Sequence, residues 1–486
     1  MKKIIFILSA ILIVSSCTKL EDLNENIKDP SEVSGESLFT GAQITLFDQM
    51  VTPNVNFNNF RMFVQHWTET TYLDEANYDL ETRTVPDNHW DELYRDVLMD
   101  LKQSAINIGE TEYPTDPNPA IKVNRLAVVD IMAVYAWSVL VETFGNVPYT
   151  DALDSDIPLP TYDDGLTIYK DLIARLNADM AAMNDSWGSF DNADNMYGGD
   201  VASWIKFANS LKLRMGIMLA DVDAAFAQTT VEAATADLSK LIQSNAENAK
   251  IIYAASQPNA NPVYDNLVAS GRKDFVAANT LVDAMNALND PRRPLYFTLS
   301  EDSLGNPAYV GGVYGYSSAY SQYSHVADAL QLPTFEGTIF DYAEVEFLLA
   351  EAIERGFTVS GTAQGHYDDA ITASILYWGG TSAEATTYLA DPLVDYTTAT
   401  GDYKQKIGEQ QWIAYYNRGF EAWNSWRRLD YPALIASDNP DFLISDIPLR
   451  YTYPIAEQTL NGANYYSASA AIGGDDVATK LFFDMY

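Results

Sequence analysis

Histidine, a common catalytic and metal-binding side chain, is rare in this 486-residue chain. None of its four histidines forms an HExxH motif or has a second histidine at metal-ligand spacing. They are His66, His89, His325 and His366. The loop 191–195 contains the oxygen ligands that Ca²⁺ prefers but does not match the EF-hand pattern. Nothing in the sequence therefore supports a metal centre or a cofactor, and Ca²⁺ binding is left open.

Carboxylate pairs are the other candidates for catalysis, because the chain has 67 Asp and Glu residues. Glu344 and Glu351 fall on a similar face of one predicted helix. A glycoside hydrolase uses two carboxylates held across a cleft, at a separation that sequence does not reveal. Solvated or structural carboxylates are far more common in so acidic a chain. A secreted, lipid-anchored glycoside hydrolase is therefore an alternative and not the leading interpretation.

The only cysteine, Cys17, stands where covalent modification is expected. Two lysines precede an apolar run from residue 4 to residue 14, which is too short to cross a bilayer and fits the core of a signal peptide. Small residues then lead to Cys17. This order resembles the lipobox of bacterial lipoproteins, whose cysteine is acylated and becomes the new N-terminus. We therefore expect residues 1–16 to be a signal peptide and Cys17 to carry the lipid anchor.

The chain after the cysteine divides into a short tether and a large body. Residues 17–38, the lipidated N-terminus and tether, are polar and contain a proline. Thr18 in place of Asp favours the outer membrane over retention in the inner membrane. Residues 39–486 have the composition of one globular domain, and the whole chain is 47% hydrophobic. Its net charge of −38 opposes binding to nucleic acid.

Helical periodicity dominates the body, so the elements that must position any site are mostly helices. Gly-Asn-Val-Pro at 145–148 is a typical stop after one of them. The predicted helices are 38–50, 90–108, 123–144, 169–183, 202–219, 275–288, 342–355, 366–377 and 409–426. Segments 250–272 and 296–335 lack this periodicity and are rich in Asn, Gly, Pro, Ser and Tyr. We predict long loops and a few short strands there, where binding sites commonly lie.

Eight segments along the chain resemble, in order, conserved stretches of the SusD/RagB family of outer-membrane lipoproteins. The run WIKFANSLKLR at 204–214 is similar to the family's W-x-K-F-A-N-S-L-K-L-R. The resemblance is strongest to the RagB-related, nutrient-binding subgroup. The eight segments are 24–30, 90–94, 143–149, 204–214, 290–292, 344–352, 423–428 and 450–454.

The resemblance implies a mostly α-helical scaffold of tetratricopeptide-like helix pairs behind a loop-rich binding face. It implies no enzymatic activity. The protein would bind a nutrient oligomer at the cell exterior and deliver it to a SusC-like, TonB-dependent barrel in the outer membrane. The motifs themselves are interpreted as scaffold. The stripe of Trp204, Phe207, Leu211 and Met215 would pack between helices, and Arg214 would pair with a nearby acid.

The ligand-binding residues are expected among aromatics on loops, because Tyr and Trp combine a flat apolar face with a polar edge that suits sugars and peptides. Two segments are candidates, one at 65–78 and one at 309–323, where glycine lets the backbone approach a ligand. The candidate residues are Trp67, Tyr72, Tyr78, Tyr314, Tyr316, Tyr320 and Tyr323.

The ligand class remains open at this level. The chain has 31 Tyr, 20 Phe and 9 Trp, which favours a neutral glycan over a peptide, while the acidity would tolerate a cationic peptide. A helical scaffold or adhesion protein without a small ligand is a further alternative. Oligomer binding without turnover would distinguish the nutrient-binding interpretation from both alternatives.

Overall fold

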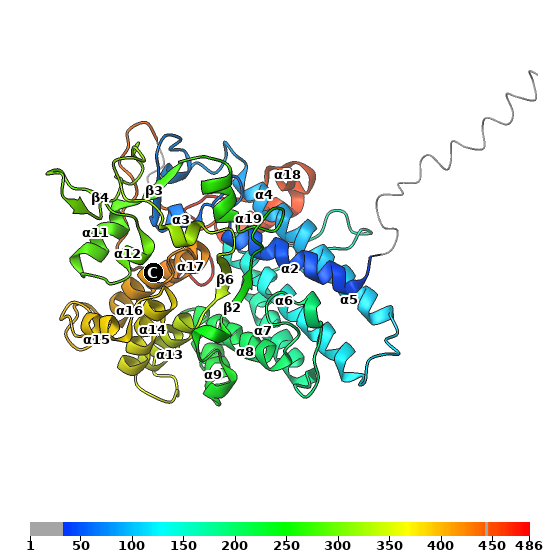
Figure 1. The fold of residues 1–486 in the computed structure, drawn as a ribbon. Coiled ribbons are helices and arrows are strands. Elements are labelled where there is room, and N and C mark those ends of the chain that lie inside the picture. Colours follow the sequence, from blue (N-terminus) through cyan, green and yellow to red (C-terminus); the bar gives the residue numbers. More distant parts are fainter. Residues whose placement is uncertain (1–32, 443–445) are drawn as a thin grey trace, which may run out of the picture.

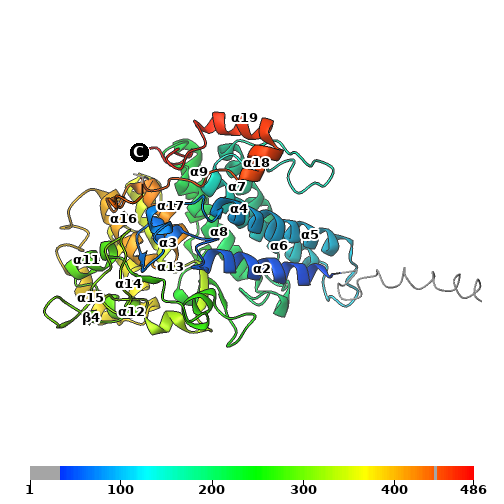
Figure 2. The same ribbon diagram turned by 90° about the horizontal axis from the view of Figure 1, so that it is seen from above.

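The structure is a computed structural model that describes residues 33–442 and 446–486. Helices dominate it, and Figures 1 and 2 show them stacked as neighbouring layers along the chain. The longer helices of the first half are α2 (Gly35–Val51), α4 (Val85–Asp91), α5 (Met99–Glu110), α6 (Ala120–Phe144), α7 (Gly165–Ala182), α8 (Val201–Met218) and α9 (Ala224–Thr235). A π-helical segment, η3 (Glu92–Leu98), joins α4 to α5.

The second half continues the same architecture. Its longer helices are α11 (Asn279–Ala287), α13 (Tyr342–Glu354), α14 (Ala363–Tyr377), α15 (Ser382–Leu389), α16 (Tyr403–Ala414), α17 (Gly419–Leu429), α18 (Ile455–Leu460) and α19 (Gly462–Ile472). The short helical segments of both halves are α3 (Phe60–Phe63), η2 (Glu75–Asn77), η4 (Asp191–Ala193), η5 (Leu238–Lys240), η6 (Asn245–Glu247), α10 (Pro262–Tyr264), η7 (Asp265–Ala269), α12 (Arg293–Tyr296) and η8 (Asp328–Gln331). The expected mostly α-helical repeat scaffold is confirmed.

Side-chain caps fix where many of these helices begin. Asp164, Asp200, Thr362 and Asp402 each precede a helix and accept a hydrogen bond from a backbone N–H in its first turn. Such caps satisfy donors that have no partner inside the helix. Neighbouring helices then pack in sequence order, as in α5–α6–α7, α8–α9 and α13–α14. This order produces the repeat-like scaffold.

The strands form three two-stranded antiparallel pairs. The pairs are β1 (Trp67–Glu69) with β3 (Phe275–Ala277), β2 (Ala249–Ile252) with β6 (Glu336–Phe340), and β4 (Ser300–Glu301) with β5 (Pro307–Ala308). In the first pair Trp67 lies opposite Ala277. Each of the first two pairs joins segments far apart in the chain, so the strands hold loops on the helical scaffold.

Three of the differences from the predicted helix boundaries have a clear structural cause. The predicted helix 275–288 begins as strand β3, and only Asn279–Ala287 is helical, because the backbone of Phe275–Ala277 pairs with β1. The predicted helix 409–426 is two helices, since Asn417 adopts a positive φ of 70° between α16 and α17. Helix α2 already begins at Gly35, capped by Ser34, so the last residues of the predicted tether are helical.

The family-like motifs lie in the core, as expected. Trp204, Phe207, Leu211 and Met215 are all fully buried, and Arg214 pairs with Glu344. Helix α6 is long and apolar enough to cross a membrane by composition, but 89% of its most apolar window is buried inside the described fold. It is the central helix between α5 and α7. The segments 204–214 and 344–352 that carry the resemblance are therefore part of the scaffold, while the segment 24–30 lies outside the described residues.

Candidate functional site

The structure brings the two aromatic segments predicted from the sequence together on one loop-rich face. Pairing of β1 with β3 places the segment after residue 65 against residues 275–277. A parallel bridge from Ala278 to Gly312 adds the second segment. The backbone N–H of Gly315 donates to Thr68 Oγ1 at 3.1 Å, and Ser317 Oγ donates to the Thr70 carbonyl at 2.7 Å. Segments separated by more than 200 residues thus form one surface.

Gly315 is the tightest point of this face. Its φ is +75°, and a Cβ there would collide with the side chain of Ser437. Its carbonyl accepts hydrogen bonds from the side-chain amides of Asn77 at 2.9 Å and Asn439 at 2.8 Å. A third chain segment, around 435–439, is thereby fixed against the other two. Only glycine combines this φ with so close an approach.

Three of the predicted ligand residues are buried and pack as core. Trp67 is fully buried and donates its indole N–H to Tyr416 Oη at 3.1 Å. Tyr314 donates to the Met62 carbonyl at 2.7 Å. Tyr78 is 1% exposed, and burial raises its pKa to about 12. Neighbouring chain segments cover these three rings in this structure, so they are placed as core residues, and the expectation that they contact ligand stays a prediction.

Tyr72 is the predicted residue with the most open ring, at 60% exposure. It borders a cavity of about 220 Å³, which we call the Tyr72 cavity. Its lining is mainly polar and comes from four chain segments. The lining residues are Pro53, Asn54, Val55, Asn56, Glu69, Tyr72, Arg83, Asn266, Arg272, Asp274 and Phe275. The cavity is of a size for one sugar ring, with an aromatic face at its edge.

The charged groups of the Tyr72 cavity are largely compensated within the protein. Burial raises the pKa of Glu69 well above its usual value, and the neighbouring Glu75 raises it further. Glu75 also pairs with Arg83, and Arg272 pairs with Asp274. These two ion pairs balance the guanidinium charges of the cavity lining. The remaining guanidinium and amide groups are donors suited to the hydroxyl oxygens of a neutral ligand.

The other three predicted tyrosines are half-buried on the same face. Tyr316 donates to Asp438 Oδ1 at 3.0 Å. Tyr320 stacks on His325 with ring centroids 4.1 Å apart, and the Lys273 ammonium lies 5.0 Å from the centre of the Tyr320 ring. These contacts already occupy part of each ring. These tyrosines can contact a ligand through the edges of their rings, but their ring faces do not form a fully open stacking surface.

Only part of this lining was predicted from the sequence. Asn266 and Arg272 fall in the predicted loop segment 250–272, although Asn266 is helical in η7, whereas Asn54, Asn56 and Arg83 carried no signal. The Arg-Lys-Asp sequence at 272–274 is a further local signal, because its two outer residues form an ion pair. Their convergence depends on strand pairing and loop packing.

Cys17 and the rest of residues 1–32 lie outside the described part of the chain.

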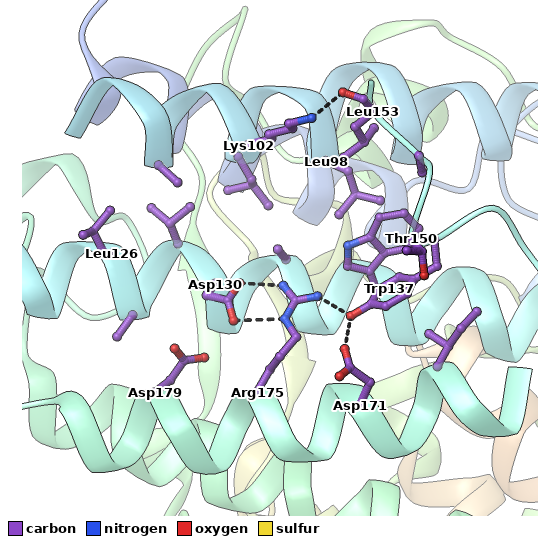
Figure 3. Close-up of a pocket in the computed structure, with 18 of the residues that line it drawn as sticks. Leu98, Lys102, Leu126, Asp130, Trp137, Thr150, Leu153, Asp171, Arg175 and Asp179 are labelled. Atoms are coloured by element: carbon purple, nitrogen blue, oxygen red, sulfur yellow. Dashed lines mark hydrogen bonds and ion pairs between the residues drawn. The ribbon is translucent and has the colours of Figure 1, made fainter. Parts of the chain in front are cut away.

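The largest cavity lies elsewhere, over α6 between α5 and α7, and has a volume of about 1000 Å³. Figure 3 shows its mostly aliphatic walls and one polar row, in which Arg175 pairs with Asp130 at 2.5 Å. Arg175 also donates to Tyr149 Oη at 2.8 Å, and Tyr149 donates to Asp171 at 2.5 Å. None of the predicted ligand residues lines this cavity, so it is not the leading candidate.

Asp179 in this second cavity gives a pH-dependent prediction. Burial, followed by the charge of Asp130 on the facing helix, raises its pKa to about 8. The native state therefore holds a proton that the unfolded chain releases, so Asp179 lowers stability as pH rises from about 4 to 8. We expect Asp179→Asn to raise the melting temperature by roughly 1–3 °C at pH 9 and by less at pH 5. Thermal unfolding at both pH values measures this, and an equal shift at both would contradict it.

Comparison with known proteins adds independent information. A family model described as starch-binding and associating with the outer membrane matches residues 27–454. A solved chitin-binding protein shares 25% identity and superposes with a TM-score of 0.80, covering 93% of this chain and 100% of its own. A chitin-binding SusD homologue from Flavobacterium johnsoniae shares 23% identity, with a TM-score of 0.76 over 92% of this chain and 98% of its own. A SusD-like protein from Bacteroides thetaiotaomicron shares 23%, with a TM-score of 0.75 over 92% and 99%. Among curated proteins there is no match.

Proposed function

Because this chain belongs to the SusD-like family of starch-binding proteins that associate with the outer membrane, we propose that it binds a neutral oligosaccharide at the cell surface, in and around the Tyr72 cavity. The observation that carries the proposal is the exposed ring of Tyr72 beside a cavity of one-sugar size lined by Asn and Arg side chains. Aromatic faces bind the apolar faces of sugar rings, while amide and guanidinium groups bind their hydroxyls.

Two kinds of oligosaccharide follow from the comparisons. The family description names starch, and a protein of the same fold at 25% identity is named for binding chitin. Both polymers are neutral, which agrees with the charge of −38 that disfavours anionic glycans. Malto-oligosaccharides and chito-oligosaccharides are therefore the probes of choice.

Binding without catalysis is the proposed activity. Glu344 and Glu351, the carboxylates considered for a hydrolase, are buried at 3% and 0% exposure. Glu344 pairs with Arg214 and Arg418, and Glu351 pairs with Arg355 and Arg428. Carboxylates that are buried and paired in this way do not reach a substrate. This arrangement supports the binding interpretation over the hydrolase alternative.

The proposed role in uptake includes a partner and an anchor. We infer that Cys17 carries lipid in the outer membrane, with the body at the cell exterior, and that a SusC-like, TonB-dependent barrel receives the ligand. The arrangement of the elements supports this, because the start of α2 lies at the opposite end of the molecule from β4 and α11 in both views (Figures 1 and 2). Val33, the first described residue, accepts a 2.8 Å hydrogen bond from Asn107 of α5.

Replacement of Tyr72 tests the binding site. We expect Tyr72→Ala to weaken binding of maltoheptaose or chitohexaose about tenfold, since loss of one stacking ring costs on the order of 1 kcal/mol or more. Calorimetry on the mature chain, purified in a detergent without a sugar headgroup, measures the affinity. Tyr466→Ala is the matched control, because Tyr466 is 69% exposed on α19. Equal affinities of both variants and the wild type would remove the Tyr72 cavity from the proposal, and sugar breakdown during titration would favour the hydrolase alternative.

A further inference from the structure

A second groove on the described part of the chain has the features of a saccharide site and shares no lining residue with the Tyr72 cavity. It has a volume of about 870 Å³ and lies between the C-terminal end of α14, the β2–β6 pair, α12 and η8. We call it the Trp378 groove. Helices α12 and α14 lie in the same half of the molecule as α11 and β4 (Figures 1 and 2).

Two aromatic side chains form a common platform in the Trp378 groove. The rings of Trp378 and Phe335 are inclined by only 22°, with centroids 6.0 Å apart, and both side chains are half-buried. Trp378 is held from behind by Tyr296, which meets it edge-on at 4.7 Å. The ring orientation is therefore fixed before any ligand arrives. Both rings keep part of their surface exposed in the groove, so each can pack against a sugar ring.

Polar groups border this platform, as recognition of hydroxyls requires. Lys250 and Glu336 pair at 2.7 Å and remain partly exposed. Asn245 donates its amide to the Ala373 carbonyl at 2.9 Å, while its Oδ1 has no hydrogen-bond partner in the described part of the protein. The Asn245 oxygen is buried, so the groups that the groove offers beside the rings are the ammonium and the carboxylate. A purely apolar docking groove would not combine these groups.

Buried aromatic residues connect strand β1 with the Trp378 groove. Tyr416 accepts the indole N–H of Trp67, and its ring lies 5.7 Å from the Trp378 ring. Both Trp67 and Tyr416 are almost fully buried. The Tyr72 cavity and the Trp378 groove share no lining residue, so a substitution in one leaves the lining of the other unchanged.

We propose that the Trp378 groove is a second binding site for a neutral oligosaccharide, with Trp378 and Phe335 as aromatic contacts and Lys250 and Glu336 as hydrogen-bonding groups. This inference rests on the proposed function, because it assigns the same ligand class to a separate surface. Two sites on one body would raise retention of a long glycan, since dissociation from one site leaves it held at the other.

The test separates the two sites by combining variants. Maltoheptaose and chitohexaose are titrated by calorimetry into the mature chain, into Tyr72→Ala, into Phe335→Leu and into the double variant. Leucine at 335 retains apolar packing and removes the ring, so the fold is preserved, and a melting curve checks this. We expect Tyr72→Ala to keep saturable binding of one sugar, and Phe335→Leu on that background to weaken it at least tenfold. Tyr466→Ala again serves as the control.

Each outcome decides one proposal. Residual binding to Tyr72→Ala that disappears with Phe335→Leu supports the second site. Complete loss in Tyr72→Ala, with Phe335→Leu at wild-type affinity, overturns the second site and leaves the proposed function intact. Residual binding that is unchanged by Phe335→Leu also overturns it. Failure of the wild type to bind either sugar overturns both proposals. A protein occupant would show as sugar-independent protection of residues 374–378 from hydrogen exchange in whole membranes, without sugar binding at the groove.

Discussion

We expect Glu344→Ala to lower the free energy of unfolding by about 3–5 kcal/mol, the typical cost of breaking a buried ion pair from one side. Arg214 binds Glu344 through two hydrogen bonds of 2.5 and 2.9 Å, and Arg418 contacts the same carboxylate. All three side chains are at most 6% exposed. Removing the carboxylate leaves two buried guanidiniums with only Asp341 and the more distant Glu421 as counter-charges.

The sign of the pH dependence gives this prediction a second measurement. Burial alone would raise the pKa of Glu344, but the charges of Arg214 and Arg418 outweigh burial and hold its pKa below the ordinary value. A carboxylate with a lowered pKa stabilises the fold above its unfolded pKa, and this contribution is lost as pH falls through the folded pKa. The difference between wild type and Glu344→Ala should therefore be full at pH 7 and shrink below about pH 4.

Urea unfolding of the wild type and the variant measures the difference through the two midpoints. Glu354→Ala is the matched control on the same helix, because Glu354 is exposed and contacts only Tyr396 among the hydrogen bonds of the described chain. Its effect should stay within about 0.5 kcal/mol. A Glu344→Ala effect as small as that of the control would show that the buried cluster contributes little to the stability of the scaffold.

The scaffold was predictable because its signals are local. The apolar period of 202–219 and the Gly-Asn-Val-Pro stop after 144 depend on neighbours within a few residues, and α8 and α6 end where expected within one or two residues. Gly145 even takes the positive φ that such a stop requires. Errors arose where a distant partner decides the backbone, as at Phe275–Ala277, whose pairing with β1 overrides a helical pattern.

The site was harder to predict because exposure of a loop aromatic is not a local property. Trp67 and Tyr72 are five residues apart in one aromatic segment, yet one ring is fully buried and the other 60% exposed. The difference arises from β3, whose sequence lies some 200 residues away, and from Tyr416. The segment could be found from its composition, while the choice within it needed the fold.

The family motifs and the candidate sites occupy different parts of the molecule. Arg214 and Glu344 come from two motif segments and meet in the core, whereas Tyr72 and Phe335 belong to loops outside every motif. A buried charge cluster tolerates little change, since each partner depends on the others. Loops on such a scaffold can change ligand without loss of the fold. This division explains why resemblance identifies the family more readily than the ligand.

The largest functional effect is expected from Cys17→Ala, which should move the protein completely from the membrane fraction to the soluble fraction. Each buried CH₂ group contributes about 0.8 kcal/mol to membrane binding, and a single acyl chain gives only reversible attachment. A lipoprotein cysteine carries several chains, and all of them depend on one thiol. The net charge of −38 gives the body no attraction to anionic headgroups that could replace the anchor.

Fractionation of washed outer membranes measures this change, and protease treatment of intact cells reports whether the body faces the exterior. Ser16→Ala is the matched control, because it keeps a small residue before the cysteine and should leave the protein in the membrane fraction. Retention of Cys17→Ala in washed membranes would contradict a lipid anchor and point to a protein partner that holds the body. Loss of Cys17→Ala from membranes with unchanged sugar affinity would show that anchoring and ligand binding are separate properties.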